Sequence, residues 1–249
     1  MGHIVLPLVL LSGLFLAMVV LVEIGRRVGR GRTFESLTTV ETSVFGLMGL
    51  LIAFTFGSAA VRFETRRSYV VQEANNIGTA YLRLDLLPAD AQPALRDAFR
   101  KYVDTRLAIY RKLPDLDAAK AEVDRMAALQ MEIWNGAIAA SARSEMPVRL
   151  LLLPALNDMI DITTTRTTAI QMHTPAIIFV MLAVTMLACA LLAGMDMSGS
   201  GLSWPHVLAF AAVLTIAFYV ILDLEFPRVG LIRIDWMDQV LVGVRASMN

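Results

Sequence analysis

The sequence contains few of the residues from which catalytic sites, metal centres and disulfide frameworks are built. It has one cysteine, Cys189, and three histidines, His3, His173 and His206, in 249 residues. A single cysteine cannot form an internal disulfide, and the histidines are too far apart in the chain to predict a zinc site. No glycine-rich phosphate loop follows a strand pattern, and no nucleophile elbow is present. We therefore expect no enzymatic activity, no cofactor and no bound metal.

An excess of charge of one sign is also lacking, because 22 basic residues balance 22 acidic ones. Nothing in this balance indicates a nucleic-acid partner. Apolar residues, in contrast, are abundant: 57% of the chain is hydrophobic and the mean hydropathy is +0.62, which is typical of an integral membrane protein. Four apolar runs are long enough to span a bilayer. They cover residues 4–22, 42–60, 175–195 and 206–222.

The first run lacks the basic start and the small-residue cleavage site of a secretory signal, so we expect a permanent membrane helix. Basic residues near the span ends favour a multi-pass membrane protein with both termini and the middle segment in the cytoplasm. The arginines on the expected cytoplasmic side are Arg62, Arg66, Arg67, Arg166, Arg228 and Arg233. The arginine-rich run at residues 25–32 argues for the opposite orientation.

The chain is organised around residues 42–88, which we predict to form one long helix that leaves the membrane and continues into water. At 100° per residue, one polar stripe crosses the boundary without a break. It contains Thr55, Ser58, Arg62, Thr65, Tyr69, Gln72, Glu73, Asn76, Thr79 and Arg83. Inside the membrane the stripe continues as Val44, Leu47 and Leu51, which would narrow a water-facing line into an apolar collar.

This stripe predicts a pore wall, but it also fits a helix that passes from lipid into a soluble bundle. In that second interpretation Thr55 and Ser58 hydrogen-bond to their own backbone carbonyls. Gly46, Gly49 and Gly57 allow another helix to approach closely. Such close packing suits an axis between subunits and equally suits the interior of one subunit.

The middle segment has the pattern of an all-helical bundle. Pro88 ends the long helix, further helices are expected at residues 93–112 and 116–142, and Pro147 opens a fourth that continues into the third span. The fold class is therefore an all-α integral membrane protein with four transmembrane helices and a cytoplasmic helical bundle formed by extensions of the second and third spans. The expected parts are residues 1–61 with spans one and two, 62–172 with the bundle, 173–226 with spans three and four, and an amphipathic segment at 227–249.

Two structural ion pairs are expected. If the two helical extensions run antiparallel from the membrane, Arg166 lies level with Glu73 and can pair with it. Asp223 and Glu225, at the end of the fourth span, are expected to pair with Arg228 or Arg233. A cation site at these carboxylates would need further oxygen ligands that the sequence does not identify.

Three stretches carry a family resemblance. They are GLLIAFTFGSAAVRFETRR at 49–67, EANNIGTAYLRLDLLP at 73–88 and ILDLEFPRVGLIRI at 221–234. These stretches resemble the bacterial bestrophin-like membrane protein family, a domain of unknown function with distant similarity to bestrophins, and the similarity covers nearly the whole chain.

The resemblance implies a homopentameric anion channel with four spans per subunit, cytoplasmic termini and a pore lined by the second span. Apolar rings of that span form the bestrophin pore neck, and Ile52 and Phe56 are the closest candidates in this sequence. The helical pattern conflicts with this assignment, because it places Phe56 opposite Thr55 and Ser58. The acidic calcium clasp of animal bestrophins has no clear counterpart, so calcium gating is not implied.

The leading hypothesis is a homo-oligomeric channel, chiefly for anions such as chloride, whose partners are copies of itself, membrane lipid and small inorganic ions. The apolar collar would gate by wetting, and rings of Arg62 and Arg66 would attract anions at the cytoplasmic mouth. A cation channel is an alternative, because Glu64 and Glu73 are interleaved with these arginines. From another class, the protein could be a non-conducting scaffold or sensor that binds a partner through its bundle.

Overall fold

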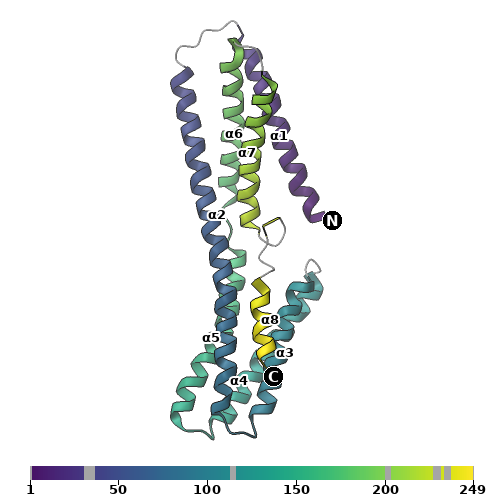
Figure 1. Cartoon of the computed structure of the whole chain (residues 1–249), viewed down its shortest axis with the longest axis vertical. Coiled ribbons are helices and arrows are strands. Elements are labelled where there is room, and N and C mark those ends of the chain that lie inside the picture. The colour runs from purple at the N-terminus through teal and green to yellow at the C-terminus, as the bar shows by residue number, and fades with distance from the viewer. Residues whose placement is uncertain are drawn as a thin grey trace. The chain divides into compact units, whose positions relative to one another are not determined.

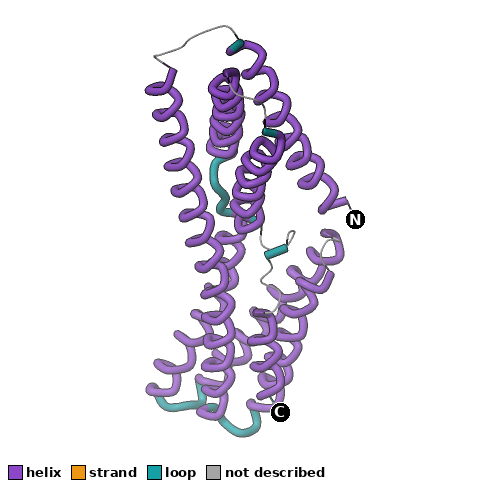
Figure 2. Tube along the Cα trace, turned by 45° about the horizontal axis from the view of Figure 1, so that its top comes forward, coloured by secondary structure: helices purple, strands orange, loops and turns teal. Residues whose placement is uncertain are grey.

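The computed structural model describes residues 2–30, 37–112, 116–199, 203–226, 231–232 and 237–248. These parts of the chain are helices joined by short connections, with no strand among them (Figure 1; Figure 2). Four helical segments are long and apolar enough to cross a membrane. The predicted all-helical class with four candidate spans is therefore confirmed. The chain divides into two compact units: unit 1 comprises Met1–Glu64 and His173–Arg233, and unit 2 comprises Thr65–Met172 and Ile234–Asn249.

Unit 1 contains the apolar helices. They are α1 (Gly2–Gly29), the first part of α2 (Leu37–Leu82), α6 (Ala176–Asp196) and α7 (Trp204–Glu225). Their shared core includes Met18 of α1, Met186 of α6 and Ala211 of α7, all fully buried. The rings of Phe45 and Phe210, 6.1 Å apart, join α2 to α7. The apolar composition that predicts the spans thus also supplies the core between them.

The closest helix contact in unit 1 is between α1 and α6. A Cβ atom on Gly25 would lie 2.1 Å from the backbone oxygen of Leu191, and one on Gly194 would lie 2.1 Å from that of Val22. Only glycine permits this approach. The glycines of the second span, which the sequence also offers for close packing, make no such contact: Gly46, Gly49 and Gly57 have no atom within 4 Å of such a Cβ in the described structure.

Unit 2 is a helical bundle. It contains the second part of α2, the 3₁₀ turn η1 (Arg83–Leu86), α3 (Gln92–Lys112), α4 (Leu116–Ser141), α5 (Met146–Gln171) and α8 (Asp238–Ser247). Phe99 of α3, Ile133 of α4 and Leu241 of α8 lie in one buried core. α2 and α5 run antiparallel, since Asn76 donates to the carbonyl of Asp158 and Arg83 donates to that of Leu151.

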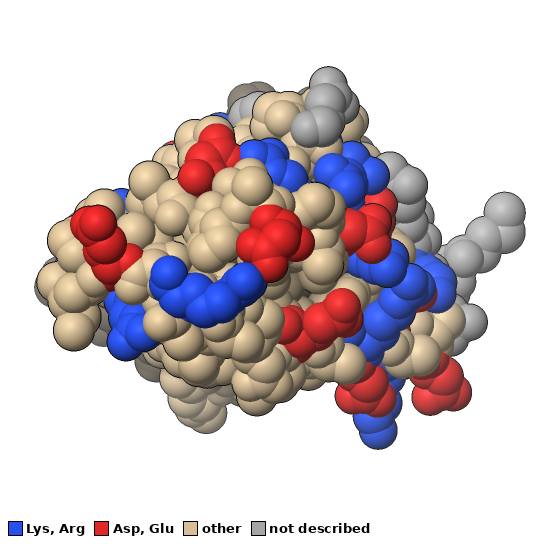
Figure 3. Space-filling model, turned by 90° about the horizontal axis from the view of Figure 1, so that it is seen from below, with Lys and Arg blue, Asp and Glu red and all other residues tan. Residues whose placement is uncertain are grey.

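Charges on the surface of unit 2 form local pairs. Seen from below, acidic and basic side chains lie beside one another (Figure 3). Arg143 and Asp90 form one such pair, and the hydrogen bond from Arg143 holds the pKa of the Asp90 carboxyl below its usual range. Because both partners of this pair are exposed, it contributes little to stability.

One prediction about the bundle is wrong. The helix opened by Pro147 was expected to continue into the third span, but α5 ends at Gln171 and α6 begins at Ala176. Pro175 explains the break, because proline has no N–H to donate and disfavours the helical conformation in the residue before it. The second span does continue without interruption, as α2 does from Leu37 to Leu82.

Candidate ion pathway along α2

One face of α2 in unit 1 is covered by no other part of the described chain. Its residues are small or apolar and are all exposed. They are Gly46, Leu47, Leu50, Ala53, Phe54, Gly57 and Val61. At 100° per residue they fall within an arc of roughly 120°, with Leu50 at its centre. We call this set the uncovered face of α2, and its large members are half or more exposed, up to 68% at Phe54.

The six residues predicted to line a pore do not lie on one face. Leu47 is on the uncovered face, and Phe56 is exposed at its flank. Leu51 and Ile52 pack against the apolar core of unit 1.

The two polar candidates are turned inward. Thr55 is only 5% exposed, and its hydroxyl donates to the carbonyl of Leu51. Ser58 is half-buried and donates to the carbonyl of Thr55 at 3.1 Å. The polar stripe at this level therefore satisfies its hydrogen bonds within the chain, and it is a different side of α2 from the uncovered face.

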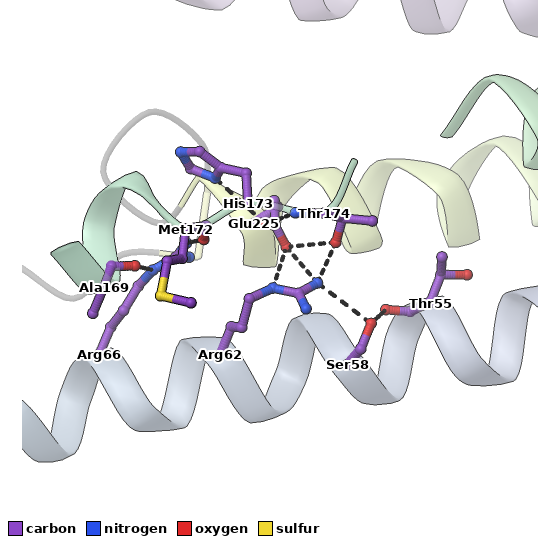
Figure 4. Close-up of polar contacts among 9 residues, drawn as sticks. All are labelled: Thr55, Ser58, Arg62, Arg66, Ala169, Met172, His173, Thr174 and Glu225. Atoms are coloured by element: carbon purple, nitrogen blue, oxygen red, sulfur yellow. Dashed lines mark hydrogen bonds and ion pairs between the residues drawn. The ribbon is translucent and has the colours of Figure 1, made fainter. Parts of the chain in front are cut away.

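One turn after Ser58 on the polar stripe, Arg62 contacts the buried carboxylate of Glu225 in α7 (Figure 4). Its Nε and Nη2 atoms lie 3.1 and 2.9 Å from Oε2 of Glu225, and Nη2 also donates to the hydroxyls of Ser58 and Thr174. The backbone N–H of Thr174 donates to Oε1 of Glu225 at 2.8 Å, and Nδ1 of His173 lies 3.4 Å from the same oxygen. Glu225 thus joins α2 to the connection that precedes α6.

The described partners of the two acidic residues at the end of α7 include Arg62 and backbone N–H groups. Glu225 pairs with Arg62, and the Asp223 carboxylate accepts hydrogen bonds from the backbone N–H groups of Leu231 and Ile232 at 2.8–3.1 Å. Arg228 and Arg233, the expected partners, lie outside the described residues. Through these backbone bonds Asp223 holds Leu231 and Ile232 close to the end of α7. Among the described residues, no group of three or more His, Cys, Asp or Glu side chains could hold a metal ion.

Arg66, one turn after Arg62, is held in unit 2 by carbonyl groups. Its Nε donates to Ala169 at 3.0 Å and its Nη2 to Met172 at 2.8 Å, while the residue is only 4% exposed. These carbonyls belong to the last turn and the C-cap of α5, where a cation is favoured by the helix dipole. The two arginines predicted to act alike therefore have different surroundings, a carboxylate for Arg62 and a helix end for Arg66.

Further along α2, Glu73 lies fully buried in unit 2 between two arginines. Arg106 of α3 donates to it through Nε at 2.5 Å and Nη2 at 3.0 Å, and Arg166 of α5 donates through Nη1. The structure thus brings together Glu73 and Arg166, as their register suggested, and adds Arg106. The sequence held a signal for Arg106, because it follows Phe99 and Val103 at helical spacing on the buried stripe of α3.

Glu73 lies outside the membrane-spanning part of α2. The helix has 46 residues, which at 1.5 Å per residue is about 70 Å, more than twice the thickness of a hydrocarbon core. Burial by itself raises the pKa of a carboxyl, but the two guanidinium groups of Arg106 and Arg166 outweigh burial and hold the pKa of Glu73 below its usual value. Glu73 is therefore a charged structural group at neutral pH.

Comparison with known proteins supports one architecture for nearly the whole chain. The model of the Bestrophin-like domain matches residues 8–235. Two solved variants of a bacterial bestrophin homologue from Klebsiella pneumoniae superpose with TM-scores of 0.71 and 0.68, each at 13% identity. The alignments cover 97% and 94% of this chain and 96% of each homologue. At this identity the similarity shows a shared fold. No curated protein matches the sequence.

Proposed function

The chain belongs to the bestrophin-like family, and from this premise we propose that it is a homo-oligomeric ion channel whose pathway is lined by the uncovered face of α2. The bestrophin resemblance implies a ring of subunits with the second span at the axis. It also implies a bacterial inner-membrane protein with both termini and unit 2 in the cytoplasm. The pentameric number comes from this resemblance alone.

The composition of the uncovered face is the observation that carries the proposal. Most exposed positions on the other spans are large and apolar, as lipid contact favours; Leu16 of α1, Val184 of α6 and Ile216 of α7 are examples. Small exposed residues, such as Gly13 of α1, are a minority there. The uncovered face of α2 instead includes Gly46, Ala53 and Gly57, with open space beside both glycines. Small residues bring helices of different subunits close to a common axis.

The large members of the uncovered face would form the gate. Leu50, Phe54 and Val61 follow one another at nearly helical spacing and would stack as apolar rings around the axis. A narrow apolar constriction conducts only when water enters it. Of the two neck candidates taken from the resemblance, Phe56 is exposed at the flank of this face, whereas Ile52 packs inside the subunit.

Two ion preferences are compatible with this architecture. The resemblance supports anion conduction, with Arg62 and Arg66 near the cytoplasmic mouth. One observation favours the second candidate, a cation channel: Glu64 is exposed and, at 100° per residue, continues the line of the uncovered face. A ring of carboxylates at a pore mouth attracts cations. The sign of the reversal potential in a salt gradient decides between the two.

Assembly is tested by single-particle imaging of the purified protein in mild detergent. We expect a closed ring of identical subunits with α2 nearest the axis and Leu50 and Phe54 facing the lumen, because cyclic symmetry brings the same face of each copy together. A monomer, or a dimer with no axial passage, would exclude the pathway. That outcome would direct attention to a scaffold or sensor that binds a partner through unit 2.

Replacing Phe54 with serine is expected to increase ion flux severalfold, because a hydroxyl lowers the cost of wetting the apolar constriction. The measurement is ion efflux from liposomes that contain the reconstituted protein. Ile177→Ser is the matched control, since Ile177 of α6 is 69% exposed, close to the 68% of Phe54. Equal flux from wild type and Phe54→Ser would show that this face does not line the pathway.

A further inference from the structure

The pairing of Arg62 bears on ion preference, because this arginine stands at the end of the membrane-spanning part of α2. At 100° per residue it lies roughly 120° around α2 from Leu50, on the flank of the uncovered face. Its side chain is 28% exposed, so it is neither free in solvent nor fully enclosed. A charge at this place acts on ions in a pathway along α2 through a wall of low dielectric constant, where screening by water is weak.

Glu225 controls both the position and the effective charge of Arg62. The carboxylate is completely buried, and one of its oxygens lies within 3.1 Å of both Nε and Nη2 of the guanidinium. Because the opposite charges are so close, their combined field decays within a short distance. The hydroxyls of Ser58 and Thr174 bind the same Nη2 atom and hold the guanidinium toward α7.

We infer that Glu225 is a positioning residue that sets the ion preference of the pathway by neutralising Arg62 and holding it on the flank of α2. This inference rests on the proposed channel function and assigns a selectivity role to α7, which does not line the pathway. Without the Glu225 carboxylate, every subunit would add one uncompensated positive charge beside the pathway. Rings of charge focus counter-ions in a confined passage, so the preference then moves toward anions whichever ion wild type favours.

The test is the reversal potential of the full-length protein, reconstituted in planar bilayers under a potassium chloride gradient. Glu225→Gln is expected to change the cation-to-anion permeability ratio about tenfold toward anions, within the range known for electrostatic focusing. Arg62→Gln removes the other charge and is expected to shift the ratio toward cations. The double variant has neither charge, so its ratio is expected to return close to that of wild type. All recordings use one pH, because His173 adds a charge near Glu225 only when protonated.

A structural role alone would not produce this pattern. If Glu225 only stabilised the fold, Glu225→Gln would lower the yield of channels and leave the permeability ratio unchanged, and that result would overturn the inference. Absence of current from wild type would instead overturn the channel proposal itself, together with the inference that rests on it.

A charge exchange provides a second test, should Glu225→Gln fail to fold. Arg62→Glu alone is expected to shift the ratio strongly toward cations. The exchanged pair Arg62→Glu with Glu225→Arg restores a neutral pair and is expected to return the ratio toward wild type. An exchanged pair that keeps the ratio of Arg62→Glu would contradict the coupling.

Discussion

Replacing Glu73 with glutamine is expected to lower the free energy of unfolding of unit 2 by about 3–5 kcal/mol, because it leaves buried guanidinium groups without their carboxylate. Glutamine has nearly the shape of glutamate, so the packing around it changes little. The charge is what disappears, and Arg106 and Arg166, at 5% and 3% exposure, are both enclosed. The large effect is therefore the cost of buried positive charge and does not measure the net value of the three-residue network.

A second arginine–carboxylate pair of the same unit serves as the control. Arg245 of α8 binds Asp104 of α3 through two hydrogen bonds of 2.8 and 3.2 Å, but the Asp104 side chain is 56% exposed. Water and salt screen this pair, so Asp104→Asn is expected to cost less than about 1 kcal/mol. Thermal unfolding of both variants in the same detergent gives the comparison. Equal losses for the two variants would contradict the structural role assigned to Glu73.

The dependence of stability on pH follows from the same pair of arginines. Because the folded-state pKa of Glu73 is lowered, its contribution is fully present above the unfolded-state pKa of a glutamate and is lost as pH falls toward the folded-state pKa. Wild type is therefore expected to lose stability on acidification through this window. Glu73→Gln lacks the titrating group, so the difference in unfolding temperature between the two proteins is expected to shrink as pH falls.

The span positions and most of the bundle helices could be predicted from the sequence, because apolar run length and proline positions are local signals. The register of Glu73 with Arg166 was also accessible, since two antiparallel helices leaving one boundary advance at equal rise per residue. The pairing of Arg106 with Glu73 is not predictable in the same way, because the apolar stripe of α3 indicates which face is buried and does not indicate which buried group the arginine contacts. Pro175 is a local signal for the break before α6, because proline disfavours the helical conformation in the residue before it. The apolar pattern on both sides of Pro175 predicts a continuous helix instead, and that prediction is wrong.

The orientation of α2 could not be predicted, because a helical pattern says which residues share a face and not what that face contacts. Thr55 shows the reason: its hydroxyl bonds to a carbonyl of its own helix, so a polar side chain can be buried without any water. The pairing of Glu225 with Arg62 joins residues 163 positions apart in the sequence, and no local pattern encodes it. The pairing predicted with Arg228 or Arg233 stays a prediction, because both arginines lie outside the described residues.

The contact between α1 and α6 gives the second large effect: Gly25→Ala is expected to lower the free energy of unfolding by about 3 kcal/mol, the upper end of the range for overpacking. An added methyl at Gly25 would meet the carbonyl oxygen of Leu191 at 2.1 Å and the backbone nitrogen of Met195 at 3.0 Å. Backbone atoms cannot rotate away as a flexible side chain can, so the two helices must separate along their contact. The gain of helix propensity from glycine to alanine, about 1 kcal/mol, offsets only part of this cost.

Gly13→Ala is the control, because Gly13 lies on the same helix with no atom within 4 Å of an added Cβ. It is expected to leave the unfolding temperature unchanged or to raise it slightly through helix propensity. Gly194→Ala places its methyl 2.1 Å from the Val22 carbonyl oxygen on the other side of the same contact. Once one alanine has separated the helices, the second meets less obstruction, so the double variant with Gly25→Ala should lose less than the sum of the single losses. Fully additive losses in the double variant would mean that the two glycines act at independent sites. If Gly25→Ala were as stable as Gly13→Ala, the two helices would not approach this closely.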